Sequence, residues 1–115
     1  MNTLLTDDIR AQLLENGAAT ARGERPDPMP VVRLFTPDAH AIWLLTELDP
    51  ADGDTAFGLI DLGMGMPCLG HVRISDLEDI RGPRDLAVLC DPHFRPKRRL
   101  SQYTHLAQVE GSIND

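Results

Sequence analysis

The sequence carries no catalytic signature of high specificity. No serine stands in a nucleophile elbow, and no histidine pair has the HExxH spacing of a zinc protease. No run approaches the roughly 18 apolar residues that a membrane span needs, and the first ten residues lack the basic and apolar regions of a signal peptide. The chain has only two cysteines, which we expect to be reduced thiols. We therefore expect a cytoplasmic protein that is not an enzyme.

What the chain does contain is an ordinary globular composition with an excess of acids. Its 115 residues, 42% apolar and 25% charged, predict a single domain with a modest core. The formal net charge is -7, from 18 acidic and 11 basic residues, which disfavours general binding to nucleic acid. An acidic face could instead repel DNA, or imitate DNA to a partner that binds it.

Four short apolar runs follow one another in the middle of the chain, separated by turns rich in proline, glycine and aspartate. They cover residues 31–35, 41–48, 56–62 and 69–74. This arrangement is typical of an antiparallel meander. A further apolar run at residues 86–90 predicts a fifth strand.

The second of these runs is apolar on both faces, which predicts a central strand covered on both sides. Strict alternation places Trp43 with Leu45 on one face, and Leu44 with Leu48 on the other. Trp43 is the only tryptophan, and we interpret it as a core residue. In the third run, Asp61 interrupts an apolar face near the end of the strand.

Helix signals surround the strands. Thr6 with two following acids predicts a helix start, and Gly17 its end. Residues 18–30 hold three prolines and read as a linker. A capping box from Ser75 to Glu78 predicts a short helix, and Leu100 begins a last helix with a frayed tail at 110–115. The predicted class is α+β, a four- to five-stranded, mainly antiparallel sheet with an N-terminal helix, a short helix after strand four and a C-terminal helix.

These segments resemble a family of small bacterial proteins defined as a domain of unknown function. The resemblance rests on LLTDDIRAQLLENG, PVVRLFTPDAHAIWLLTELDP, DTAFGLIDLGMGMPCLGHVRISDLEDIRGP, the pair HF at 93–94 and LSQY near the end. It extends over nearly the whole chain. It implies a setting on plasmids, integrative elements and prophages, and it supplies no activity or catalytic residues.

Two Cys-x-x-His pairs form the sharpest chemical pattern, Cys68 with His71 and Cys90 with His93. Two thiolates and two imidazoles could form a tetrahedral zinc site. The cysteines stand beside predicted strands, where residues three apart point to opposite faces. We therefore predict no metal and no cofactor, with a metal-dependent enzyme or metal sensor as the alternative.

Acidic residues gather around the predicted hairpin and its following strand. Aspartate and glycine are residues that a turn selects for conformational reasons, so a solvated turn is one interpretation. The other is a negative patch facing a basic partner. It would comprise Glu47, Asp49, Asp52, Asp54 and Asp61. The next turn offers Met64 and Met66, which either tuck beneath the sheet or form an apolar contact surface.

Basic residues collect late in the chain, outside any nucleic-acid-binding motif. The contact candidates among them are Arg95, Lys97, Arg98 and Arg99. Together with the acidic patch they favour a non-enzymatic protein that binds a host or mobile-element protein that handles nucleic acid. Given the setting implied by the resemblance, the most concrete form is an inhibitor of a host-defence complex of the restriction or CRISPR type.

Overall fold

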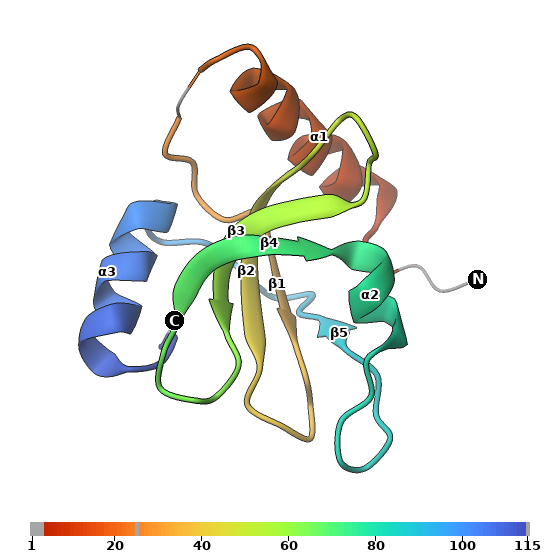
Figure 1. Cartoon of the computed structure of the whole chain (residues 1–115), viewed down its shortest axis with the longest axis vertical. Helices are drawn as coiled ribbons and strands as arrows, with labels where there is room; N and C mark the ends of the chain where they lie inside the picture. The colour runs from red at the N-terminus through yellow and green to blue at the C-terminus, as the bar shows by residue number, and fades with distance from the viewer. Residues whose placement is uncertain (1–3, 25, 115) are drawn as a thin grey trace.

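A computed structural model of the chain describes residues 4–24 and 26–114. Along these residues lie three helices and five strands (Figure 1). In chain order they are α1 (Asp7–Ala21), β1 (Val32–Phe35), β2 (Ile42–Leu48), β3 (Thr55–Asp61), β4 (Cys68–Arg73), α2 (Ile74–Asp79), β5 (Leu89–Cys90) and α3 (Leu100–Glu110). The α+β class predicted from the sequence is confirmed.

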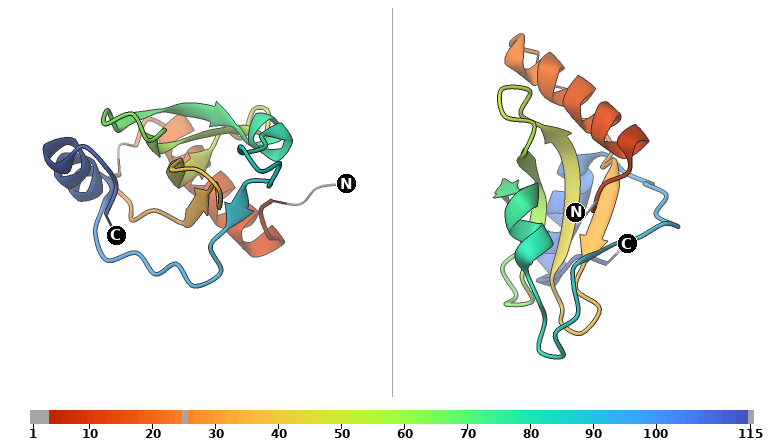
Figure 2. Two further views of the ribbon diagram at one scale, coloured as in Figure 1. Left: turned by 90° about the horizontal axis from the view of Figure 1, so that it is seen from below. Right: turned by 90° about the vertical axis from the view of Figure 1, so that its right-hand side faces the viewer.

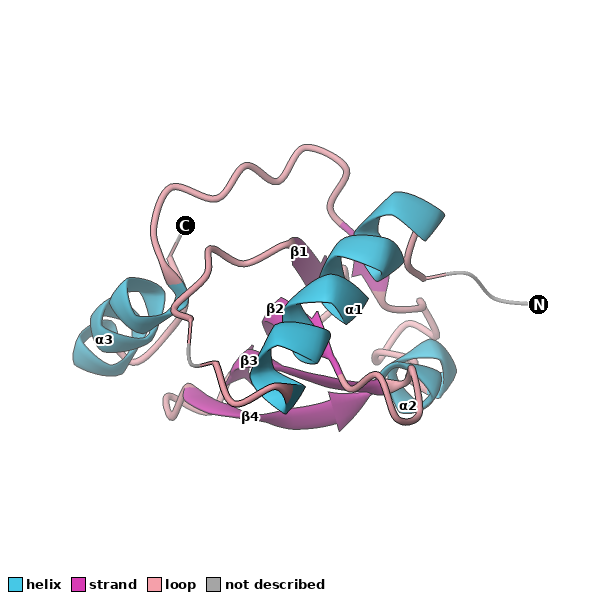
Figure 3. Ribbon diagram, turned by 90° about the horizontal axis from the view of Figure 1, so that it is seen from above, coloured by secondary structure: helices cyan, strands magenta, loops and turns pink. Residues whose placement is uncertain are grey.

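The five strands form one antiparallel sheet in the order β4-β3-β2-β1-β5. The first four strands are a meander, as predicted, and β5 pairs with the free edge of β1. α1 and α2 lie against one face of the sheet and α3 lies against the other (Figures 1 and 3). The long segment between β5 and α3 passes around the sheet from one side to the other (Figure 2).

Two hydrophobic clusters, one on each face, hold the helices to the sheet. Trp43 and Leu45 of β2 face α1, whereas Leu44 of the same strand contacts the cluster around α3. The prediction of a central strand buried on both faces is confirmed, and Trp43 is only 3% exposed. None of the helices in the described ranges is long and apolar enough to cross a membrane.

A β-bulge in β2 overturns the predicted placement of Leu48. The register of β2 against β3 shifts between Leu45 and Glu47, so Thr46 is an extra residue in the strand. Leu48 consequently lies opposite Ala56 and joins the cluster on the α1 face, not the face of Leu44. Alternation along a sequence assumes an unbroken ladder, and a bulge reverses it from that point onward.

α1 does not stop at Gly17, as the sequence suggested, but continues to Ala21 within the predicted linker. Gly17 is buried where the helix crosses the end of β2. A Cβ atom built on Gly17 would stand 1.7 Å from the carbonyl oxygen of Leu48. The residue is therefore glycine because the strand backbone approaches the helix, not because the helix ends there. The predicted start is confirmed, since the Thr6 hydroxyl accepts a hydrogen bond from the Ile9 N–H at 3.2 Å.

The predicted capping box at the start of α2 is replaced by a tertiary cap. Ser75 lies inside the helix. The N-cap residue is Arg73, and its side chain makes no capping hydrogen bond. Instead Asp54, in the β2–β3 hairpin, accepts hydrogen bonds from the Ser75 N–H at 2.9 Å and the Ser75 hydroxyl at 2.6 Å. The hairpin thus supplies the acceptors that the first turn of a helix needs.

Residues 111–114, part of the predicted frayed tail, fold back onto the sheet. Gly111 ends the helix in the left-handed conformation, at φ 80°. Ile113 is then buried against the sheet, and its N–H donates to the Asp61 carboxylate at 3.0 Å. The same carboxylate accepts from the Gly63 N–H at 2.9 Å. These contacts explain the acid that interrupts the apolar pattern of β3.

β5 is shorter than the predicted strand at residues 86–90. Residues 81–87 form a turn of their own, in which the Gly82 N–H donates to the Leu86 carbonyl at 2.9 Å. Asp38 of the β1–β2 turn accepts from the Arg84 N–H at 2.6 Å and holds this turn in place. Only Leu89 and Cys90 remain to pair with β1.

Candidate functional site

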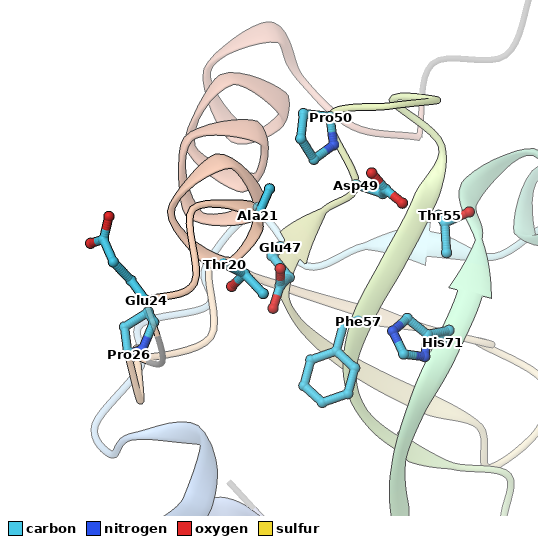
Figure 4. A pocket seen from close by; sticks show the side chains of 11 residues that line it. Thr20, Ala21, Glu24, Pro26, Glu47, Asp49, Pro50, Thr55, Phe57 and His71 are labelled. Carbon is cyan, nitrogen blue, oxygen red and sulfur yellow. The ribbon is translucent and has the colours of Figure 1, made fainter.

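A pocket of about 450 Å³ opens where the C-terminal half of α1 passes the ends of the central strands. Pockets of about 300–1,000 Å³ are the usual size for binding sites. Figure 4 shows that its walls come from α1, the segment after α1, and strands β2, β3 and β4. Three carboxylates line it, those of Glu24, Glu47 and Asp49, and we call it the acidic pocket.

An aromatic pair forms part of the wall of the acidic pocket. Phe57 of β3 and His71 of β4 are cross-strand partners, and their ring centroids are 5.0 Å apart. Phe57 is half-buried and also packs against the cluster beneath α3. Carboxylates beside an aromatic ring are a suitable environment for a cation, because the ring face and the acids both attract positive charge.

The bulge in β2 positions the central acid of this pocket. Without it, Glu47 would share the face of Leu45, under α1. With it, Glu47 lies opposite Phe57, on the face that carries His71. The Asn16 side chain of α1 donates to the carbonyl of Thr46 at 2.9 Å, and the Thr46 hydroxyl donates to the carbonyl of Phe57 at 3.3 Å. These two hydrogen bonds fix the bulged residue.

The other two acids of the pocket have local partners that leave their charge in place. Asp49 accepts a hydrogen bond from the Ala51 N–H at 2.8 Å, which orders the hairpin turn. Glu24 forms an exposed ion pair with Arg22 at 2.8 Å. Exposed pairs of this kind contribute at most about 1 kcal/mol, so Glu24 can exchange Arg22 for another cation.

Asp52 and Asp54, also predicted as partner contacts, serve the fold directly. Asp54 caps α2. Asp52 accepts from the Thr55 hydroxyl at 2.7 Å and from the N–H groups of Asp54 and Thr55 at 2.9 and 3.0 Å. The Thr55 hydroxyl, followed by the backbone donors, lowers the pKa of Asp52 to about 2. Both acids remain on the hairpin beside the acidic pocket, but replacing them would disturb the turn.

This hydrogen-bonding predicts the titration of Asp52. Because its folded-state pKa is below the ordinary value of 3.8, its contribution to stability is complete above about pH 4 and is lost as the pH falls through about 2. NMR titration of the Asp52 carboxyl carbon should place the midpoint near 2. In Thr55→Val, which removes the hydroxyl, the midpoint should move upward. An unchanged midpoint in that variant would show that the hydroxyl is not the main cause.

Asp61 and the methionines, also predicted as contact residues, lie away from the acidic pocket. Asp61 is 3% exposed and holds Gly63 and Ile113, so we leave it out of the proposed contact surface. Met64 and Met66 are 73% and 80% exposed, which excludes the alternative that they tuck beneath the sheet.

The predicted basic segment wraps from β5 to α3, and much of it contacts its own chain. Arg99 donates to the Asp27 carbonyl at 2.9 Å, and Arg98 lies over the Tyr103 ring at 5.8 Å. Arg95 donates to the carbonyl of its neighbour Phe94 at 3.0 Å, and the Lys97 N–H donates to the Tyr103 hydroxyl. The structure does not bring this segment into the acidic pocket.

The two Cys-x-x-His pairs are far apart. Cys68 is on β4 and Cys90 on β5, the opposite edges of the sheet, and four strand spacings separate them by about 19 Å. Within residues 4–24 and 26–114, no group of three or more His, Cys, Asp or Glu side chains could hold a metal ion. Burial, followed by the charge of Asp91, raises the pKa of the Cys90 thiol.

The acidic pocket brings together residues that sequence reasoning assigned to different hypotheses. Glu47 and Asp49 came from the predicted acidic patch, and His71 from the predicted metal pair. Phe57 and Glu24 were missed. The alternation of β3 could have placed Phe57 beside His71. No sequence signal indicated that Glu24, in the segment after α1, lines a pocket with residues of the central strands.

The chain matches the family model described as "Protein of unknown function (DUF2958)" over residues 4–114, and it belongs to this family. The resemblance stated from the sequence is thereby confirmed at the level of a domain-of-unknown-function family. No match was found among curated proteins or among solved structures.

Proposed function

We propose that this protein is a non-enzymatic binding protein whose acidic pocket accepts a basic side chain of a partner protein. The observation that supports the proposal best is that Glu24, Glu47 and Asp49 line one pocket together with Phe57 and His71. A lysine or arginine in such a pocket gains charge-assisted hydrogen bonds and contact with an aromatic ring.

The net charge of the chain supports a basic partner. At -7, the protein attracts cationic surfaces over a distance and repels anionic ones. We further propose that the partner belongs to a cytoplasmic complex that handles nucleic acid, because such complexes present lysine and arginine to phosphates. The mobile-element setting implied by the sequence resemblance favours a host-defence complex of the restriction or CRISPR type, which the protein would inhibit by occupying that surface.

Neutralising the acidic pocket is expected to abolish partner capture. In the triple variant Glu24→Gln, Glu47→Gln and Asp49→Asn, each amide keeps the size of the acid and removes its charge. The Asn also keeps the oxygen that accepts from Ala51. Recovery of proteins captured from host lysate at low salt should fall by about ten-fold or more. Capture by the parent should also weaken with salt, since exposed charges are screened over about 10 Å at 0.1 M.

A matched control removes three charges elsewhere. Glu15→Gln, Asp79→Asn and Asp85→Asn change exposed acids outside the pocket, and asparagine suits the positive φ of 64° at Asp85. This variant should retain capture, and both triple variants should unfold at the parent's denaturant midpoint. Equal recovery by the pocket variant and the parent would refute the proposed function. Equal loss in both variants would point to net charge rather than to the pocket.

A further inference from the structure

The outer edge of β4 presents main-chain groups that no other strand uses. β4 is an edge strand, and among the described residues no strand lies beyond it. The Ile74 N–H donates to the Asp54 carbonyl at 2.9 Å, in register with the pairing of β4 and β3. Hydrogen-bonded pairs alternate along an antiparallel ladder, so the N–H groups of Leu69, His71 and Arg73 point away from β3.

This edge lacks the features that prevent other chains from pairing with a sheet. Residues 68–73 contain no proline and no lysine, and the register of β4 against β3 has no bulge. The side chains along it are open to solvent: Leu69 is 44% exposed, and Cys68, His71 and Arg73 are also exposed. A six-residue strand of this kind can accept a further strand.

The two ends of β4 differ in chemistry. Its start carries the exposed side chains of Met64, Met66 and Leu69. The two methionines belong to residues 62–67, between β3 and β4, which we call the methionine turn. The backbone of this turn lies near Gly111 at the end of α3, a helix that also exposes Val109. At its other end stand two acids and one arginine. Asp76 binds the Arg73 guanidinium at 3.1 Å, and Asp54 binds Ser75.

We propose that β4 binds an extended segment of the partner protein, apolar at one end and basic at the other, as a sixth strand of the sheet. The main-chain groups of Leu69, His71 and Arg73 supply the hydrogen bonds. The methionine turn and Leu69 contact the apolar end, and Asp54 and Asp76 attract the basic end. The inference rests on the proposed protein-binding function and adds the mode by which the partner is held.

A foreign segment fits this edge better than a second copy of the chain. Two copies would bring together two molecules of net charge -7, and antiparallel pairing of β4 with itself would place the acidic end of each copy beside the apolar end of the other. A basic, apolar segment has the complementary charge.

The test separates the backbone N–H of residue 71 from its side chain. His71→Pro removes an N–H that points outward, so the ladder to β3 is kept, whereas His71→Ala removes only the side chain. Peptides are selected on the parent protein from a phage-displayed random library. We expect selected peptides to combine apolar and basic residues and to bind His71→Pro about ten-fold more weakly than His71→Ala, because both variants lack the imidazole and only His71→Pro lacks the N–H.

Two further measurements guard against a folding artefact. Val72→Pro, which removes an N–H directed at β3, should lower the melting temperature, whereas His71→Pro should not. In the parent, a bound peptide should slow hydrogen exchange at the amides of Leu69, His71 and Arg73. Failure to select peptides, equal binding to the His71→Pro and His71→Ala variants, or unprotected amides would overturn the inference.

The outcome is distinguishable from a failure of the proposed function. If the acidic pocket alone binds the partner, His71→Pro captures it as well as His71→Ala, and the pocket variant does not. If the pocket has no role, neutralising it leaves capture unchanged whatever happens at β4.

Discussion

Replacing Gly17 with alanine is expected to destabilise the protein by about 3 kcal/mol, although alanine is the better helix former. The new Cβ would stand 1.7 Å from the Leu48 carbonyl oxygen and 2.8 Å from its carbonyl carbon. Both are backbone atoms at the end of β2, so α1 must move away from the sheet. Helix propensity alone predicts the opposite sign, a gain of about 1 kcal/mol.

The matched control for this substitution is Ala11→Gly. Ala11 is exposed on the same helix, so its replacement should cost only the helix-propensity difference of about 1 kcal/mol. Chemical denaturation of the three proteins gives the free energies of unfolding. If Gly17→Ala were as stable as the parent or more stable, the close approach of α1 to Leu48 would be wrong. The acidic pocket, which lies at this crossing, should lose partner capture in Gly17→Ala and keep it in Ala11→Gly.

Replacing Trp43 with alanine is expected to lower the free energy of unfolding by about 3–5 kcal/mol, the usual range for a large buried aromatic residue. Trp43 is 3% exposed in the central strand and lies opposite Leu34 and Ile60. Its removal leaves a cavity between the sheet and α1 that these neighbours cannot close. Urea denaturation followed by circular dichroism measures the effect without relying on tryptophan fluorescence.

Trp43→Phe serves as the comparison. It keeps an aromatic ring in the same cluster and should cost clearly less than the alanine variant. An unchanged denaturation midpoint in Trp43→Ala would mean that the side chain is not a core residue and that the central position of β2 is wrong.

Local patterns in the sequence were sufficient to predict the strands, the class and the central position of Trp43. Apolar runs and turn residues act over a few positions, and the meander joins neighbours in the chain, so local information carried the topology. The same locality misled the interpretation of Gly17. A glycine that ends a helix and a glycine that admits a neighbouring backbone leave the same letter in the sequence.

The candidate site was predicted only in part for a related reason. Glu47 and Asp49 were singled out by their charge, but the orientation of Glu47 depends on the extra residue Thr46 and its bond from Asn16. Asp54 was interpreted as a contact residue, whereas its oxygens cap a helix that begins 20 residues later. Such tertiary contacts have no periodicity, and therefore no local pattern shows them.

The bulge in β2 also bears on how this pocket could arise and disappear during evolution. Deleting Thr46 would place Glu47 directly after Leu45 in a regular ladder, so the glutamate would stay on the face opposite Leu45 and the pocket would keep its acid. Straightening the strand without a deletion, so that Thr46 pairs with Phe57, would instead turn Glu47 onto the face of Leu45 and toward α1. In relatives, a glutamate at this position therefore marks the binding site where the residue before it is bulged or missing, and not where that residue pairs in the ladder. The pairing of the second strand with the third, and not the identity of the acid alone, is then the character by which members of the family that share this pocket can be recognised.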